Sequence, residues 1–206
     1  MNETGSVKFS CDQVTTEIPE FAGFAALNKY RRQLVELGLI GVDANGIGFG
    51  NISLRDGASS QFYITGSGTG GILELTSADC AKVAAYDFGK NWLRYEGRTM
   101  ASSESLTHAA VYESDPTARA VIHCHDLKLW SAFLDKVPTT PTSVEYGIPE
   151  MAFAVKRLFE TTDVKTKNIF VMGGHEGGIV GFGKSMEAAY IAIARAKEAA
   201  FKLSRR

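Results

Sequence analysis

The sequence has few of the features that mark specialised classes of protein. Its 206 residues include only three cysteines, Cys11, Cys80 and Cys124, whose spacings match neither a disulfide framework nor a zinc ribbon. The formal net charge is −1, and there is no basic stripe of the kind that binds nucleic acid. We therefore expect reduced thiols, no nucleic-acid partner, and contacts with small molecules or further copies of the chain.

Long apolar runs are also missing. No stretch approaches the ~18 consecutive apolar residues of a membrane-spanning helix. The first residues are polar and acidic, whereas a secretory signal has a basic start followed by an apolar run. These absences predict a cytoplasmic protein that neither enters a membrane nor is exported.

What remains is the composition of an ordinary globular protein, with 45% hydrophobic and 22% charged residues. A chain of this length can bury a sizeable core in one domain, and no linker, repeat or low-complexity segment divides it. We expect residues 1–206 to form a single domain, with residues 1–18 as a loosely ordered N-terminal segment.

Helix-like and strand-like patterns alternate along the chain. Apolar residues at helical spacing predict a first helix from Pro19 to about Gly38. A capping-box pattern at 76–79 predicts a helix that continues through Val83 and Tyr86. The other expected elements are a hairpin (51–55 and 61–65), strands (91–95, 120–125, 169–172 and 179–182) and helices (103–114, 127–134, 149–159 and 186–200). The pattern predicts a sheet flanked by helices.

The strongest functional signal is His123-Cys124-His125, which follows an apolar, strand-like run. Side chains alternate along a strand, so both imidazoles face one side and Cys124 faces the other. This arrangement is typical of a metal site, although an isolated pair fits exposed or core histidines equally well. Cys124 fits a small buried hydrophobe better than a ligand. A catalytic zinc ion usually has three protein ligands and one open position, so a third ligand is needed.

Only two other histidines are available. His175 follows a strand-like run and is surrounded by glycines that let the backbone approach a bound group. We predict that it is the third ligand, with a simple turn residue as the alternative. His108 lies one helical turn after Glu104, which suggests either support for Glu104 or a purely structural role. Glu104 itself has a structural alternative, a carboxylate favoured by a helix dipole.

A glycine-rich segment, residues 66–71, has the spacing G-x-G-x-x-G. It follows a hairpin and does not open a βαβ unit, which argues against a dinucleotide site. We favour a loop whose backbone N–H groups form an anion-binding nest.

Several motifs occur in one order along the chain, namely Gly50-Asn51-Ile52-Ser53, Ile64-Thr65-Gly66-Ser67-Gly68, Ser102-Ser103-Glu104, the strand ending His123-Cys124-His125, and the later His175. With these motifs the sequence resembles the class II aldolase/adducin family from about residue 25 to 200, in particular its fuculose-phosphate aldolase-like, metal-dependent members. The segment 146–151 also resembles the one that opens the next helix in many members.

The resemblance implies a fold and an assembly. The fold is a three-layer α/β/α sandwich around a central mixed, largely antiparallel sheet. The assembly is a homotetramer with sites near the subunit interfaces.

The resemblance also implies roles for particular residues. His123, His125 and His175 would bind one divalent metal ion per chain, most often Zn²⁺, and Glu104 would be the catalytic carboxylate. The positions that match the phosphate site of phosphosugar members are Asn51, Ser67, Gly68, Ser102 and Ser103. Amide, hydroxyl and backbone N–H groups at a helix start hold a dianion without an arginine clamp. The metal would act as a Lewis acid that spreads the charge of the enediolate formed on C–C cleavage, while Glu104 moves the proton.

We therefore predict an aldolase-type lyase acting on a small, phosphorylated hydroxy-carbonyl or sugar substrate. The alternatives are a sugar-phosphate dehydratase that uses the same metal and Glu104, and a non-catalytic metal-retaining binding protein. Glutamate after two serines resembles the aldolases and dehydratases, whereas the related epimerases usually carry aspartate there.

Two departures from the family pattern bear on the substrate. Only residues 127–144 separate the histidine pair from Tyr146, where sugar-phosphate aldolases have a longer segment whose tyrosine handles the proton on the aldehyde side. That tyrosine has no evident counterpart in this sequence. His175 is followed by Glu176, where glycine is commoner, so Glu176 is a candidate to enter the site.

Overall fold

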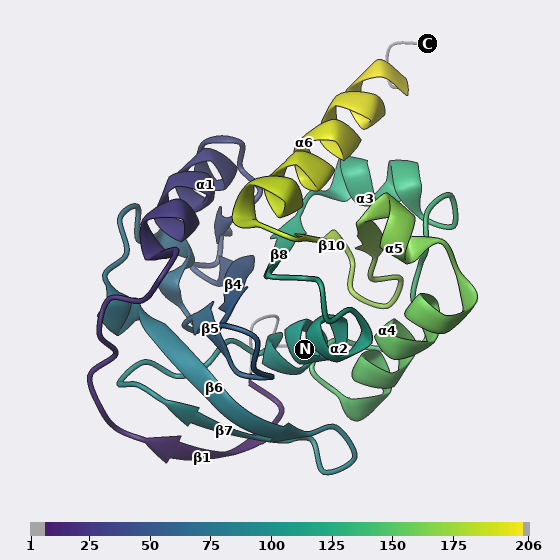
Figure 1. Ribbon diagram of the computed structural model, residues 1–206. Helices are drawn as coiled ribbons and strands as arrows, with labels where there is room; N and C mark the ends of the chain where they lie inside the picture. The colour runs from purple at the N-terminus through teal and green to yellow at the C-terminus, as the bar shows by residue number, and fades with distance from the viewer. Residues whose placement is uncertain (1–6, 204–206) are drawn as a thin grey trace.

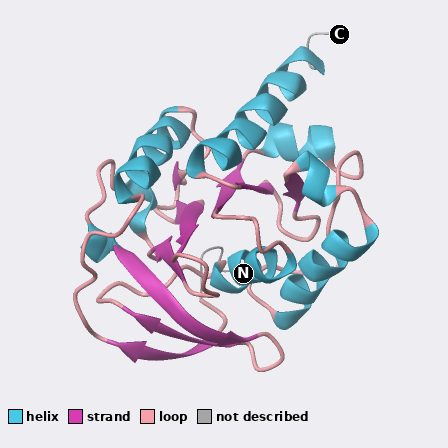
Figure 2. Ribbon diagram, in the orientation of Figure 1, coloured by secondary structure: helices cyan, strands magenta, loops and turns pink. Residues whose placement is uncertain are grey.

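The computed structural model describes residues 7–203 and has one large sheet with helices packed against it (Figures 1 and 2). The strand order is β1-β7-β6-β5-β4-β8-β10-β9. Neighbouring strands run antiparallel, except that β1 is parallel to β7. The eight strands are β1 (Ser10–Val14), β4 (Asn51–Arg55), β5 (Phe62–Thr65), β6 (Cys80–Asp87), β7 (Trp92–Glu96), β8 (Ala120–His125), β9 (Ile169–Val171) and β10 (Gly178–Gly183). This confirms the mixed, largely antiparallel sheet.

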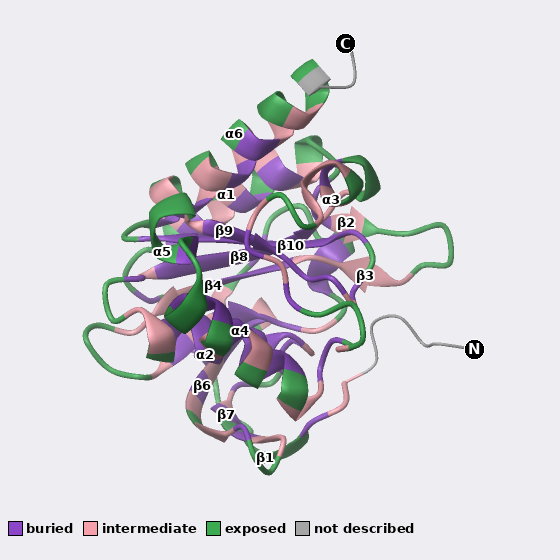
Figure 3. Ribbon diagram, turned by 90° about the vertical axis from the view of Figure 1, so that its right-hand side faces the viewer, coloured by how far each residue is buried: buried purple, intermediate pink, exposed green. Residues whose placement is uncertain are grey.

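Helices cover both faces of the sheet, as Figure 3 shows for α1, α3 and α6 on one side and α2 and α4 on the other. Two apolar cores result, one beneath each group of helices, and α5 contributes to the second through Val164. The three-layer α/β/α arrangement is therefore confirmed. The helices are α1 (Phe24–Glu36), α2 (Ser105–Ser114), α3 (Leu127–Phe133), α4 (Pro149–Thr161), α5 (Val164–Lys167) and α6 (Met186–Leu203).

Small elements lie between α1 and β6. A two-stranded hairpin of β2 (Gly41–Val42) and β3 (Gly48–Phe49) contacts the 3₁₀ turn η1 (Thr69–Gly71). A second 3₁₀ turn, η2 (Ser77–Asp79), precedes β6. The first helix begins at Phe24 and not at Pro19, because Gly23 before it adopts the left-handed φ of +87°.

The helix predicted through Val83 and Tyr86 is wrong, because this segment is strand β6. The capping box does exist, with the Thr76 amide and hydroxyl both donating to Asp79 Oδ2 at 2.8 Å, but it caps only the short turn η2. A register shift between Val83 and Ala85 marks a β-bulge. The extra residue brings Val83 and Tyr86 to the same core, and their three-residue spacing therefore imitates a helix.

The segment expected to be loosely ordered, residues 1–18, contains strand β1. All five residues of β1 are exposed, so no buried face marks it in the sequence, and the backbone ladder to β7 holds it in place. Residues 1–6 lie outside the described residues. Among the helices that the structure describes, none combines the length and apolarity needed to cross a bilayer.

Candidate active site

Strand β8 positions two of the predicted ligands. His123 and His125 alternate with Cys124, whose side chain is buried in the core beneath α1 and α6. Both histidines therefore project from the same side of the strand. Backbone pairing with β4 on one side and β10 on the other fixes the register of β8 in the sheet. In this register Asn51 of β4 lies directly opposite His123.

His175 reaches the same place from the turn between β9 and β10. The His175 amide donates to the Met172 carbonyl, and the Gly178 amide donates to the His175 carbonyl at 2.8 Å. The glycines before it allow close packing, because a Cβ at Gly173 would overlap the Thr140 carbonyl and one at Gly174 the Val144 carbonyl. The turn is therefore pressed against the segment 140–144, and this contact aims His175 at β8.

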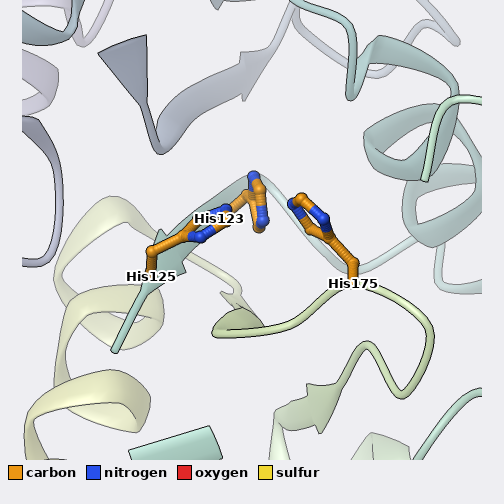
Figure 4. A group of neighbouring side chains, drawn as sticks. All are labelled: His123, His125 and His175. Carbon is orange, nitrogen blue, oxygen red and sulfur yellow. The ribbon is translucent and has the colours of Figure 1, made fainter. Parts of the chain in front are cut away.

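The three imidazoles form one cluster (Figure 4). Each offers a ring nitrogen, and these atoms all lie within 4.8 Å of one another. Burial lowers the pKa of His175 to about 3 and that of His125 to about 4, while burial and the two neighbouring rings hold the pKa of His123 well below its usual range. The rings are thus neutral near pH 7, which is the form that binds metal ions. His123 Nε2 is buried and has no hydrogen-bond partner within the described part of the chain, as expected of a nitrogen that binds an ion. Three nitrogen donors of this kind fit a divalent metal such as zinc.

Asn51 supports His123 from the neighbouring strand. Its amide nitrogen lies 3.4 Å from His123 Nδ1, so the amide group contacts the ring nitrogen other than Nε2. A polar contact on one imidazole nitrogen helps to hold the ring in a fixed orientation. Asn51 Oδ1 has no partner among the described residues.

Glu104 is the N-terminal boundary residue of α2 and is only 2% exposed. Thr107 donates a hydrogen bond of 2.6 Å to its Oε2, whereas Oε1 has no hydrogen-bond partner in residues 7–203. Burial raises the pKa of Glu104 to about 7, and the bond from Thr107 and the charge of Lys8 act against this rise. A carboxyl group whose pKa lies near neutrality can both take up and release a proton.

A single cavity of about 1270 Å³ joins these groups. Its wall includes the nine residues predicted as metal ligands, catalytic carboxylate and phosphate site, namely Asn51, Ser67, Gly68, Ser102, Ser103, Glu104, His123, His125 and His175. The glycine-rich loop forms part of this wall, and Gly68 there adopts a φ of +77° that favours glycine. Glu176 also lines the cavity, whereas His108 does not.

The sequence of residues 43–202 matches the family described as class II aldolase and adducin N-terminal domain. The chain belongs to the class II aldolase/adducin family. No curated protein matches the chain significantly in sequence.

Solved structures of class II aldolases share the fold. An L-fuculose 1-phosphate aldolase superposes with a TM-score of 0.68 at 20% identity, covering 91% of this chain and 87% of its own. The L-fuculose-1-phosphate aldolase of Thermus thermophilus gives 0.63 at 23% identity, with 88% and 92% covered. A sugar-phosphate aldolase of Thermotoga maritima gives 0.66 at 18% identity, with 88% and 93% covered. At these identities the likeness establishes the fold.

Within this class II aldolase fold, the structure adds residues that the sequence did not place. Tyr146 lines the cavity, and its ring centroid lies 4.5 Å from that of His175. The Lys8 ammonium lies 4.3 Å from the centre of the Tyr146 ring. Asn91 joins the two segments, since its amide donates to the carbonyls of Lys8 and Gly147 at 3.0 and 3.2 Å. The sequence indicated Tyr146 only as part of a segment that resembles the family, and nothing in the sequence indicated Lys8.

His108 packs behind the cavity. Its Nδ1 lies 2.7 Å from Ser53 Oγ, which in turn lies 2.7 Å from the Tyr112 hydroxyl. All three residues are buried, and burial lowers the pKa of His108 to about 3. The contacts tie α2 to β4, which agrees with a structural role and holds the helix that carries Glu104.

Proposed function

We propose that the protein is a metal-dependent, aldolase-type lyase that cleaves or forms a C–C bond in a small, phosphorylated hydroxy-carbonyl or sugar compound. The observation that carries the proposal is the placement of Glu104, a buried carboxyl group with a pKa near 7 and one unpartnered oxygen, in the same cavity as three neutral histidines.

His123, His125 and His175 would hold one divalent ion, with zinc the best match to three imidazole donors. Such an ion, when bound, supplies Lewis-acid polarisation of the substrate carbonyl. Asn51 would keep the His123 ring in its orientation, and the tight packing of the glycines before His175 would do the same for the third ligand.

Glu104 would move the proton. In its ionised form it takes a proton from the hydroxyl or carbon that becomes acidic beside the polarised carbonyl, and it returns the proton in the opposite direction. Thr107 favours the ionised form by donating to Oε2, which leaves Oε1 to face the substrate. Burial in the wall of the cavity keeps bulk water from competing for this proton.

The phosphate of the substrate would bind at the glycine-rich loop and the start of α2. Ser67 and Gly68 on the loop and Ser102 and Ser103 before α2 line one cavity together with Asn51. Hydroxyl, amide and backbone N–H groups at a helix start suit a dianion. We also propose a homotetramer in the cytoplasm, and light scattering on the purified protein tests the number of subunits.

Glu104→Gln tests the proposal. Zinc-loaded wild-type protein, screened against phosphorylated aldoses and ketoses, is expected to release an aldehyde, and Glu104→Gln should lose turnover by at least ~100-fold. Both proteins should retain one ion per chain. Glu150→Gln, a matched change at an exposed position on α4, should retain full turnover.

The product separates the alternatives. Loss of water without an aldehyde would identify a dehydratase that uses the same residues. If metal-loaded wild-type protein turns over none of these compounds, the lyase proposal is contradicted in favour of a binding protein.

A further inference from the structure

One side chain on the buried face of α1 is charged. Leu27, Arg31 and Leu34 follow at helical spacing and face the core, and Arg31 is only 1% exposed. Removing a guanidinium group from water is costly unless it is fully hydrogen-bonded. An apolar residue would fill this position at a lower free-energy cost, so the presence of a buried arginine needs an explanation.

The guanidinium of Arg31 is directed at residues 69–73, a segment that overlaps the end of the glycine-rich loop (66–71). Its Nη2 donates to the carbonyls of Thr69 at 2.6 Å and Gly70 at 3.2 Å, and its Nη1 donates to those of Ile72 and, at 3.4 Å, Leu73. Four backbone carbonyl groups within five residues thus accept hydrogen bonds from one buried cation.

Among the described residues, none forms an ion pair with Arg31, whereas its exposed neighbour Arg32 pairs with Glu74. Burial lowers the pKa of Arg31, and Cys80 and Asp79 act against this shift. Because an arginine remains protonated in proteins, the loop rests on a positive charge balanced mainly by peptide dipoles.

The other side of the same segment belongs to the cavity. Thr69 and Gly70, whose carbonyls meet Arg31, are both part of the cavity wall. In a trans peptide unit the C=O and the following N–H point in opposite directions, so each carbonyl that faces Arg31 turns an N–H away from it. The hairpin β2–β3 closes the loop from another direction, because a Cβ at Gly70 would overlap the Gly41 carbonyl.

Among the described residues, the glycine-rich part of the cavity wall includes no cationic side chain. The lysines in the wall are Lys128 and Lys197, from α3 and α6, and Lys197 is paired with Asp126 at 2.6 Å. Arg31, directly behind the wall, is the nearest source of positive charge that the contacts of this loop reveal.

We propose that Arg31 is a positioning residue that supports the anion subsite from behind, supplying its positive charge through the peptide units of the loop, so that the site selects a dianionic group such as a phosphate monoester over a neutral one. The inference rests on the proposed function, since it concerns the phosphate end of that substrate. Arg31 touches no substrate atom in this arrangement and acts only through residues 69–73.

Binding of inorganic phosphate to the zinc-loaded full-length chain tests the proposal by calorimetry. The variants are Arg31→Met, which removes the charge at similar volume, Arg31→Lys, which keeps it, and Arg32→Met as the matched control on the same helix. Arg31→Met should raise the Kd for phosphate at least ~10-fold, while Arg31→Lys stays within about 3-fold of wild type. Arg32→Met should bind as wild type does, and zinc content should be one ion per chain throughout.

Two results would overturn the proposal while leaving the proposed function intact. One is a folded Arg31→Met protein with wild-type affinity for phosphate. The other is an Arg31→Lys protein that binds phosphate as weakly as Arg31→Met does, because the retained charge would then contribute nothing. If Arg31→Met does not fold, the corresponding result is an Arg31→Lys protein that binds phosphate more than ~10-fold more weakly than wild type. If zinc-loaded wild-type protein itself fails to bind phosphate, the anion subsite of the proposed function fails, and the role of Arg31 fails with it.

Discussion

Three buried polar atoms at the centre of the site, Glu104 Oε1, His123 Nε2 and Asn51 Oδ1, have no hydrogen-bond partner among the described residues. An unsatisfied buried polar group destabilises a folded protein by ~1–3 kcal/mol, so such groups are usually retained for function. The sequence indicated these three residues through their motifs. It gave no sign of Thr107, because its bond to Glu104 depends on the local geometry at the start of α2.

Glu104 should destabilise the metal-free protein at neutral pH. Its folded pKa of about 7 lies above the ordinary value of 4.5, so the folded state holds the proton more tightly, and the contribution of Glu104 to stability falls as pH rises from 4.5 to 7. Glu104→Gln removes this loss and should add ~3 kcal/mol to the free energy of unfolding at pH 8, but less than ~1 kcal/mol at pH 5. Urea unfolding at both pH values measures this, and Glu150→Gln should follow wild type. An equal effect at both pH values would contradict the pKa assignment.

Thr107 should set the pH at which Glu104 ionises. Its hydroxyl favours the carboxylate, so Thr107→Val should raise the pKa of Glu104 by up to ~1 unit. Thr107→Ser keeps the hydroxyl and should leave the pKa in place. A carbon-13 NMR titration of the Glu104 carboxyl group measures the pKa without a substrate. Identical titrations for the valine and serine variants would show that the hydrogen bond has no such effect.

At the scale of elements, the site depends on strands and turns that arrive from distant parts of the chain. Strand β8 was predicted within its bounds because an apolar run with alternating histidines fits only one orientation. Strand β6 was mistaken for a helix because its bulge breaks the alternation at Val83. Arg31 was missed because its partners lie in the loop 69–73, although its place on the apolar stripe of α1 was a readable signal.

The turn that carries His175 should tolerate no side chain at Gly174. A Cβ there would overlap the Val144 carbonyl, so Gly174→Ala should push the turn away from β8 and weaken zinc binding at least ~10-fold, at a cost of ~1–3 kcal/mol in stability. Competition with a zinc-binding dye measures the affinity. Gly89→Ala, a change in a turn with only ordinary contacts, serves as the matched control. Unchanged zinc affinity in Gly174→Ala would mean that this packing does not aim His175.

At the scale of the whole molecule, one sheet separates two cores, and all four histidines of the chain are buried or nearly so with lowered pKa values. The fold class followed from the alternation of helices and strands together with the family resemblance. The order of the strands and the depth of the cavity did not, because they depend on contacts between segments far apart in the sequence.

The buried histidines should make the metal-free protein sensitive to acid. Their folded pKa values lie below 6.5, so the unfolded chain takes up protons first, and stability falls as pH drops below about 6.5. Glu104 has the opposite effect on stability, but it is a single group and the histidines are four. The net loss should reach ~4 kcal/mol per pH unit at its steepest, as urea unfolding between pH 7 and 5 would measure. A flat profile over this range would contradict the neutral, buried state of these rings.

The central claim is that His123, His125 and His175 hold one divalent metal ion. Elemental analysis of protein purified without chelator and dialysed against zinc tests it most directly, with wild type compared to His123→Ala and folding checked by circular dichroism. The account predicts about one ion per chain in wild type and a loss of the ion in His123→Ala. A folded wild-type protein that takes up no zinc, or a His123→Ala protein that retains the full amount, would contradict it.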